Sequence, residues 1–551
     1  LDSLPEAENL VLQRAAIIGR TFWDDLVRYL TNNEMEAQKV SQRLESLRDR
    51  GLIYHREHSS LTGSQEYLFK HALLRDEAYS TVLLKHRRDY HRQVALWVEE
   101  NAGDRLEEHL ALIAYHAMKG GQSDQAADWW IRAGERAVKQ CSMAEAKSFF
   151  ERALKLINPE YTTRLWRATL GHDEALGTLG EVDARHEDDQ TLLNLAEQLQ
   201  DEQCLAEAYY RIASQAISEG DNQAALAALA KGLQAAVSAG DVSRQALILP
   251  LQVITYFKEG DLDAAEPLIE QALALAHKTE DPDIIARALN NLAPYYQATG
   301  DLSRSVALMH QVVDINQQQG NRLGESIGLI NLSYYYLSGG QFETGHKLLE
   351  RALTIAKRLG AKSCIAYALL NLGLAEWRLD HPQGAYETLD QSLEALQALG
   401  DQGGLASRQF YLGLACESAG DFSDSRKSFN AAYDSFKSLG ATAGMIEAQA
   451  GLARLARKDG DISQAEKLSL EIIDYLDKEG PHNLELPILV YLSCVKVFDQ
   501  SGNAQLFQHS VKKGYREIRN RFEMISDENW RKTYLEAIPE NRELLECFKG
   551  K

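Results

Sequence analysis

The chain has 551 residues, a net charge of −21 and a sequence pI near 5.2. This charge argues against a general binder of nucleic acids or anionic membranes, because the long-range field of the protein repels both. The length exceeds one ordinary hydrophobic core, so we expect two or more domains or an extended repeat array. Six widely spaced cysteines and no membrane-spanning apolar run predict a cytoplasmic protein that makes no membrane contact.

The first hundred residues predict a small mixed domain. Helices are expected around 5–18, 22–31 and 34–50, followed by two strands in GLIYHRE and EYLFKHA. In the second strand Tyr67 and Phe69 alternate with polar neighbours, as in a half-buried strand. Because the chain begins on Leu1 within a pattern that is already helical, we also expect it to be a piece of a longer polypeptide.

Three helices and a two-stranded wing predict a winged-helix domain over residues 1–82, followed by a linker helix over 83–105. Winged helices often enter the major groove of DNA. The third helix here, EMEAQKVSQRLESLRDR, carries as many acids as bases, and the wing tip SSLTGSQ is uncharged. The sequence therefore disfavours nucleic acid as a partner.

Glycines lie on a grid of forty residues in the second half of the chain. One set comprises Gly220, Gly260, Gly300, Gly340, Gly420 and Gly460, with Asp380 in the vacant slot. A second set, offset by twenty, comprises Gly240, Gly320, Gly360, Gly400, Gly440 and Gly480, with Glu280 in its gap. Aspartate follows most glycines of the first set, so each turn is expected to end one helix and to cap the next.

The repeated unit is therefore a pair of antiparallel helices, present at least seven times. A column of small residues marks a close crossing of the two helices: Ala225, Ala265, Ser305, Gly345, Ala385, Ser425 and Ala465. This pattern resembles the tetratricopeptide repeat in a forty-residue form. The resemblance implies an all-α, right-handed superhelix, with degenerate repeats over 106–204, regular repeats over 205–520 and a polar capping helix within 521–551.

The segment FKHALLRDEAY, followed by HRRDYHRQVALWVEE, resembles the signal-transduction ATPases with numerous domains, the STAND class. The opening LDSLPEAENLVLQRAAIIGRTFWDDLV resembles the winged-helix entry of bacterial members, such as the maltose-regulon activator and those linked to class III cyclases or kinases. His71 falls where related proteins place a histidine that contacts the β-phosphate of ADP. Lys70 and Ala72 replace the flanking Met and Asp of that motif, so only the histidine carries over.

The resemblance implies an ATPase core as a partner of this chain, ADP or ATP in the full-length protein, and oligomerisation on activation. No phosphate-binding loop lies in these residues, since the only Gly-Lys dipeptide is Gly550–Lys551. No catalytic or metal-binding motif is present either, so the chain itself is expected to be no enzyme and to hold no cofactor or metal. The acidic run HEDDQ, residues 186–190, is predicted to be a solvated loop.

The predicted binding surface is the concave face of the array, where a protein, a peptide or a small inducer would bind. One position of the first helix in each repeat points into this face, and its candidate residues are Arg211, Asn291, Asn331, Asn371 and Tyr411. Tyr334 and Trp377 follow one turn later. The alternative is that the asparagines bridge neighbouring helices, and that His71 is a structural residue.

The leading interpretation is the sensor arm of a STAND-type ATPase, in which the array binds an inducer and the winged helix relays this to a nucleotide-binding core. A scaffold for protein assembly without a nucleotide switch is the second hypothesis. The regulatory part of a transcription activator is the third, and nothing after Gln500 resembles the helix-turn-helix of that branch.

Overall fold

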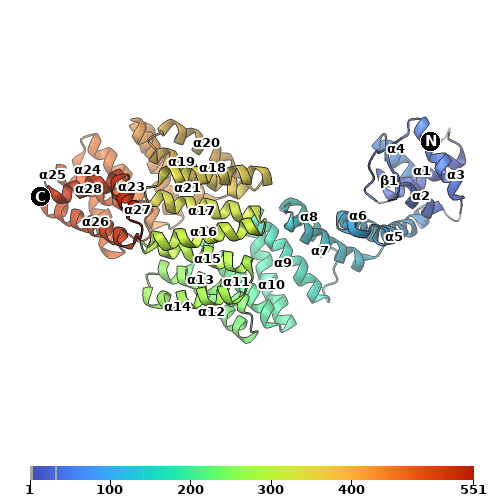
Figure 1. The fold of residues 1–551 in the computed structure, drawn as a ribbon, viewed down its shortest axis with the longest axis horizontal. Helices are drawn as coiled ribbons and strands as arrows, with labels where there is room; N and C mark the ends of the chain where they lie inside the picture. Colours follow the sequence, from blue (N-terminus) through green and yellow to red (C-terminus); the bar gives the residue numbers. More distant parts are fainter. Residues whose placement is uncertain (1–3, 32–33, 62, 141, 180, 551) are drawn as a thin grey trace. The chain divides into compact units, whose positions relative to one another are not determined.

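The computed structural model describes residues 4–31, 34–61, 63–140, 142–179 and 181–550. It is all-helical apart from one small sheet, and most of the helices are labelled in Figure 1. The chain divides into two compact units. The first comprises the described residues of 1–178 and 182–199, and the second those of 179–181 and 200–551.

The first unit begins with three helices and a three-stranded antiparallel sheet. Its elements are α1 (Glu6–Ile18), β1 (Thr21–Trp23), α2 (Asp24–Thr31), α3 (Ala37–Asp49), β2 (Ile53–His55) and β3 (Glu66–Phe69). The predicted helices and both predicted strands are present. The second helix starts at Asp24 rather than at residue 22, because Thr21–Trp23 pair with β3 as an additional strand. The strand order is β1-β3-β2, and Phe22 of β1 packs against Phe69 of β3 in the core.

Helices continue through the rest of the first unit. They are α4 (Ala72–Thr81), α5 (Leu84–Asn101), the 3₁₀ helix η1 (Gly103–His109), α6 (Leu110–Lys119), α7 (Ser123–Lys139), α8 (Met143–Leu154), α9 (Thr162–Leu179) and α10 (Val182–Leu199). The prediction of a solvated loop at HEDDQ was wrong, since this run lies inside α10. His172 of α9 donates from Nδ1 to Asp188 at 2.7 Å, so this part of the acidic run packs against a neighbouring helix.

The second unit contains the regular array. Its paired helices are α11 (Glu202–Glu219), α12 (Asn222–Ser238), α13 (Val242–Lys258), α14 (Leu262–Lys278), α15 (Pro282–Ala298), α16 (Leu302–Gln318), α17 (Arg322–Ser338), α18 (Phe342–Leu359), α19 (Lys362–Arg378), α20 (Pro382–Leu399), α21 (Gln402–Ala419), α22 (Phe422–Ser438), α23 (Thr442–Lys458) and α24 (Ile462–Lys478). Most odd-numbered helices pack against the odd-numbered helix of the next repeat, which places them on the inner side of the array.

The forty-residue grid has the structural role that the sequence predicts. The side chains of Asp221, Asp261, Asp301, Asp421 and Asp461 each accept a hydrogen bond from a backbone N–H in the first turn of the following helix. The grid glycines have positive φ, and Glu280 and Asp380 adopt φ of 55° and 63° in the vacant slots. The left-handed conformation is thus required by the turn even where glycine is missing.

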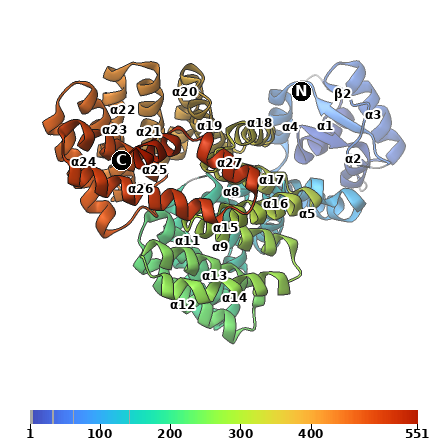
Figure 2. The ribbon, with the colours of Figure 1, turned by 60° about the vertical axis from the view of Figure 1, so that its left-hand side comes forward.

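The array ends in four further helices: α25 (Pro487–Ser501), α26 (Ala504–Met524), α27 (Glu528–Glu536) and α28 (Pro539–Lys549). The sequence predicts one polar helix over about 527–548. The structure instead has two helices in this stretch, and they bury Trp530, Tyr534 and Leu544. These large side chains are buried because the segment folds back onto the array, as α27 beside α17 shows in Figure 2.

Candidate functional site

Residues 525–549, here called the C-terminal strap, pack along the turns that join the two helices of three successive repeats. Ser526 bonds Ser303 at the start of α16, and the Trp530 indole N–H donates to the carbonyl of Gly339 at 2.9 Å. Further along, Arg378 at the end of α19 pairs with Glu540 at 2.8 Å. The strap therefore spans the turns near residues 300, 340 and 380.

Glycine at position 339 is what allows the indole to approach. A Cβ atom there would lie 2.4 Å from Nε1 of Trp530, closer than any side chain tolerates. A Cβ atom added at Gly340 would also lie close to the strap, at 3.2 Å from Ile538. The Gly-Gly pair at this turn is therefore explained by the strap, whereas the other repeats need only one glycine for the left-handed turn.

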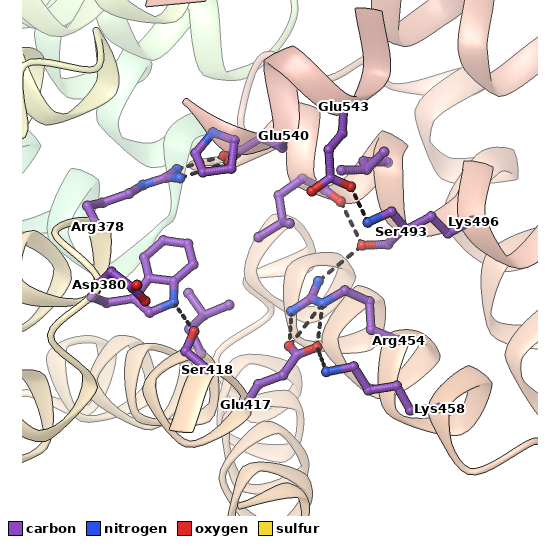
Figure 3. Close-up of a pocket in the computed structure, with 15 residues that line it drawn as sticks. Arg378, Asp380, Glu417, Ser418, Arg454, Lys458, Ser493, Lys496, Glu540 and Glu543 are labelled. Atoms are coloured by element: carbon purple, nitrogen blue, oxygen red, sulfur yellow. Dashed lines mark hydrogen bonds and ion pairs between the residues drawn. The ribbon is translucent and has the colours of Figure 1, made fainter. Parts of the chain in front are cut away.

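A pocket of about 490 Å³ remains open beside the strap (Figure 3). It lies between α28 and the inner ends of α19, α21, α23 and α25. Trp377, Leu414, Leu489 and Leu492 give it an apolar wall, and Trp377 donates from its indole N–H to Ser418 at 2.9 Å. Its volume is in the range of small-molecule sites.

Eight charged residues line this pocket in equal numbers of each sign: Arg378, Arg454, Lys458, Lys496, Asp380, Glu417, Glu540 and Glu543. Arg454 holds Glu417 through two nitrogens, at 2.8 and 3.0 Å, and also bonds Ser493. Burial raises the pKa of the Glu417 carboxyl, but Arg454 and Lys458 outweigh burial and hold this pKa below its usual value. Lys496 pairs with Glu543 of the strap.

This arrangement suits binding rather than catalysis. The buried charges are already paired, which fixes their positions for polar contacts with a ligand. Among the residues that the structure describes, no group of three His, Cys, Asp or Glu side chains could hold a metal ion. The described helices also include none with the length and apolar character needed to cross a membrane.

Tyr411 and Tyr334 lie beside two buried carboxyl groups, those of Glu447 and Glu485. Tyr411 is 4% exposed and its hydroxyl donates to Glu485 at 2.5 Å. Glu447 accepts a bond from the backbone N–H of Leu486 at 2.6 Å. Burial, followed by the nearby Glu485 charge, raises the pKa of Glu447 to about 8, and burial raises that of Glu485 to about 6. The two tyrosines thus belong to the packed interior of the groove.

Glu447→Gln is expected to stabilise the second unit at alkaline pH. The folded-state pKa of about 8 exceeds the ordinary 4.5, so the folded protein keeps a proton that the unfolded chain has released. Stability is therefore lost as the pH rises from about 5 through 8. The glutamine keeps an acceptor for Leu486 and cannot ionise, so the variant should gain roughly 2 kcal/mol or more at about pH 8.5 and nothing below about pH 5.

The measurement is urea unfolding across this pH range, with the exposed Glu270→Gln as the control. A Glu447→Gln variant whose advantage does not grow with pH would contradict a proton held at this carboxyl.

The remaining predicted inner-face residues are only partly buried. Asn331 donates to the side chain of Asn290 at 2.9 Å, which is the bridge between neighbouring helices foreseen as the alternative role. Asn291 and Asn371 are partly exposed on α15 and α19. Arg211 pairs with Glu207 one turn away, at 2.8 Å. Of this set, Trp377 alone lies on the wall of the pocket.

In the first unit, His71 is exposed at the N-cap of α4 and makes no capping bond. The motif around it is largely structural. Arg75 donates to the carbonyl of Ala16, and both Arg75 and Arg87 lie over the ring of Tyr79. The hydroxyl of Tyr79 lies 3.0 Å from Nε2 of His91. These contacts tie α4 and α5 to α1 and leave His71 free to meet another molecule.

Sequence reasoning missed Arg454 and Arg378, which form much of the pocket. A signal for Arg454 was present, because its column reads Tyr334, Leu374, Leu414 and Arg454 in successive repeats. A charge in an otherwise apolar inner column indicates a special site. Arg378 carries no comparable signal, since its role depends on Glu540, which lies 162 residues away in the sequence.

The chain is similar to one protein family, to one curated protein and to several solved structures. The tetratricopeptide repeat family matches residues 285–318, which make up most of α15 and all of α16. An uncharacterized protein of Rhizobium meliloti, R02095, is 33% identical over 94 residues, or 17% of this chain. The match spans only 9% of that protein's length.

Among solved structures, a STAND protein with a tetratricopeptide repeat sensor from Pyrococcus horikoshii is 14% identical, with a TM-score of 0.39. The alignment covers 87% of this chain and 64% of that protein. A Rap protein complexed with competence and sporulation factor is 12% identical with a TM-score of 0.44, covering 63% and 98%. The family match, together with the paired helices of the second unit, shows that the fold is an all-helical repeat solenoid of the tetratricopeptide type.

Proposed function

We propose that this chain is the sensor arm of a signalling ATPase of the STAND class. In this proposal the pocket on the inner face of the second unit binds a protein, a peptide or a small inducer. The opening of the first unit is a winged helix that docks on a nucleotide-binding core and relays the binding event to it. The array itself carries out no catalysis.

The observation that carries the proposal is a set of exposed leucines at the two ends of α4, one of them beside His71. Leu73, Leu83 and Leu84 are 82%, 61% and 75% exposed, although the core of this unit is well filled. Single exposed leucines are ordinary, but three of this exposure at the two ends of one short helix favour a docking surface. Lys70 and His71 are exposed next to Leu73 at the start of α4, which suits contact with a phosphate group.

His71→Ala tests this proposal in the full-length protein with its nucleotide-binding core. A histidine N–H that donates to an ADP phosphate contributes roughly 1.5–3 kcal/mol, so its loss should speed ADP release by about ten- to a hundred-fold. Because His71 is exposed in this chain, the melting temperature of the chain alone should not change. Release is followed with a fluorescent ADP analogue.

The exposed His277→Ala, on α14, is the matched control and should retain ADP as the wild type does. If His71→Ala also retains ADP like the wild type, the nucleotide role fails. A second variant, Leu73→Ser with Leu84→Ser, should weaken docking of the core without unfolding the unit, since both leucines are exposed.

A scaffold without a nucleotide switch is the second candidate, and the match to the tetratricopeptide repeat favours it. In that case the pocket beside Trp377 would bind a partner, and variants at His71 and Leu73 would have no effect on any nucleotide. The two candidates therefore differ in the ADP-release experiment.

A further inference from the structure

The repeats provide an internal comparison that singles out Glu325. It is the fourth residue of α17, and the same position in other repeats is Gln245, Ile285, Ile365, Leu405 and Met445. Glu325 is fully buried, so a carboxylate stands where most repeats place an apolar side chain. Such a replacement is not explained by packing.

Two arginines hold this buried carboxylate. Arg322, the first residue of α17, donates to Oε2 at 2.7 Å, and Arg351 of α18 bonds Oε1. Burial raises the pKa of Glu325, but the bonds from Arg322 and Arg351 outweigh burial and hold this pKa below its usual value. The carboxylate is therefore ionised, and its role is to fix the positions of two guanidinium groups.

A third arginine, Arg358, lies seven residues after Arg351, which is about two helical turns further along α18. It is exposed, and no ion pair of Arg358 is present among the described residues. Only this repeat carries arginine at all three of these positions. The cluster of three arginines and one carboxylate has a local charge of +2, in a chain whose net charge is −21.

Stability does not account for the cluster. A buried ion pair generally gives no more stability than well-packed apolar residues of similar volume, and the neighbouring repeats show that isoleucine or leucine fits this position. Positively charged guanidinium groups held apart by a carboxylate are instead suited to bind an anion with several oxygens.

The arginines line a cavity of about 410 Å³, whose apolar wall is formed by Ile355 and Leu359. This volume exceeds what one inorganic anion needs and lies in the range of small-molecule sites. None of its lining residues belongs to the pocket beside Trp377. We propose that the cavity binds a small phosphorylated organic molecule, with the phosphoryl group on Arg322, Arg351 and Arg358 and the organic part on Ile355 and Leu359.

Calorimetric titration of the whole chain tests this site with three probes. Phenyl phosphate combines a phosphoryl dianion with an apolar body, and it should bind about tenfold more tightly than inorganic phosphate, since burying the ring contributes roughly 1.5 kcal/mol. A short phosphoserine peptide is the third probe. Tighter binding of that peptide than of phenyl phosphate would overturn the assignment to a small molecule, and no binding of any probe at millimolar concentration would overturn the site.

Arg358→Gln is the decisive variant, because this arginine supports no buried partner. Its loss should weaken phenyl phosphate binding by about tenfold or more, as expected for a charge-assisted bond, with an unchanged melting temperature. Arg304→Gln on α16, whose side chain is 68% exposed, is the matched control and should bind as the wild type. Equal affinity in Arg358→Gln and wild type would contradict the proposal.

Glu325→Leu tests the premise separately. Leucine occupies this position at residue 405, and the Arg322 and Arg351 side chains are 63% and 50% exposed, so their charges stay hydrated when the carboxylate is removed. The variant should therefore fold and melt at about the temperature of the wild type. It should also bind phenyl phosphate less tightly, since Arg322 and Arg351 are no longer held in place. A strongly lowered melting temperature with unchanged binding would show that Glu325 serves stability alone.

Discussion

Replacing Trp530 by alanine is expected to destabilise the second unit by about 3–5 kcal/mol, the usual cost of removing a buried aromatic side chain. The indole is 6% exposed, lies 5.8 Å from the ring of Tyr336 and bonds the carbonyl of Gly339. Loss of the ring leaves a cavity between the strap and α17 and an unpaired carbonyl. Hydrogen exchange of peptides from α16 to α19 should rise, whereas exchange in the first unit should not change.

Gly339→Ala should reproduce this effect from the other side of the contact, because its Cβ would lie 2.4 Å from the indole nitrogen. The matched control is Gly403→Ala within α21, where the nearest atom to the new Cβ is 3.6 Å away. Gly403 lies in the first turn of α21, so alanine there should leave stability unchanged or raise it by less than about 1 kcal/mol. If Trp530→Ala and Gly339→Ala leave exchange in α16 to α19 unchanged, the strap does not pack as described.

Acidification is expected to destabilise the first unit through a buried pair of histidines. His116 Nε2 must donate to the carbonyl of Ile18 at 3.0 Å, so its Nδ1 accepts a bond from Nδ1 of His91 at 2.8 Å. His91 Nε2 in turn accepts from the hydroxyl of Tyr79. Both imidazole rings must be neutral in this chain of hydrogen bonds, because each ring has one acceptor nitrogen that would lose its bond on protonation.

Burial, with the nearby positive Lys119, lowers the pKa of His91 to about 4, and burial with His91 lowers that of His116 to about 3. Both folded-state values lie below the ordinary 6.5, so the unfolded chain binds protons first. The stabilisation is complete above about pH 6.5 and is lost as the pH falls from there toward 3. By about pH 5 the pair should have contributed on the order of 4 kcal/mol to this loss.

Urea unfolding at about pH 7.5, 6 and 5 measures the effect, with hydrogen exchange in α4 to α6 to identify the first unit. The double variant His91→Gln, His116→Gln should be less stable at neutral pH and should show a flatter pH profile. His55→Gln, at an exposed histidine of β2, should keep the wild-type profile. Parallel profiles in the double variant and wild type would place the acid sensitivity elsewhere.

The glycine grid allowed the array to be predicted closely, because every determinant is local. A left-handed turn residue and an aspartate cap specify where one helix ends and the next begins, as at Gly300 and Asp301. The buried column of small residues repeats for the same reason, and Ser305 and Ala385 are both fully buried as predicted. Periodicity of this kind can be read from one sequence without knowledge of distant contacts.

The strap and the pocket could not be predicted in this way. Trp530 and Gly339 lie 191 residues apart, and no spacing in the sequence connects them. The polar surface of α27 and α28 favoured a simple cap, since the few large side chains that are buried are outnumbered by charged ones. Likewise, Tyr411 has the position predicted for the inner face, but its burial depends on Glu485 from a loop two repeats later.

The bond between Ser303 and Ser526 joins points 223 residues apart in the sequence and so affects the mechanics of the second unit. In an open solenoid each repeat contacts only its neighbours, so the end repeats can unfold separately and the array can extend along its axis. Here the strap connects α16 to the last helices. The repeats between them are therefore linked twice, through their neighbours and through the strap. Stretching or unwinding any one of these repeats strains all the others. We therefore expect the repeats from α16 to the C-terminal helices to unfold together, in one cooperative step.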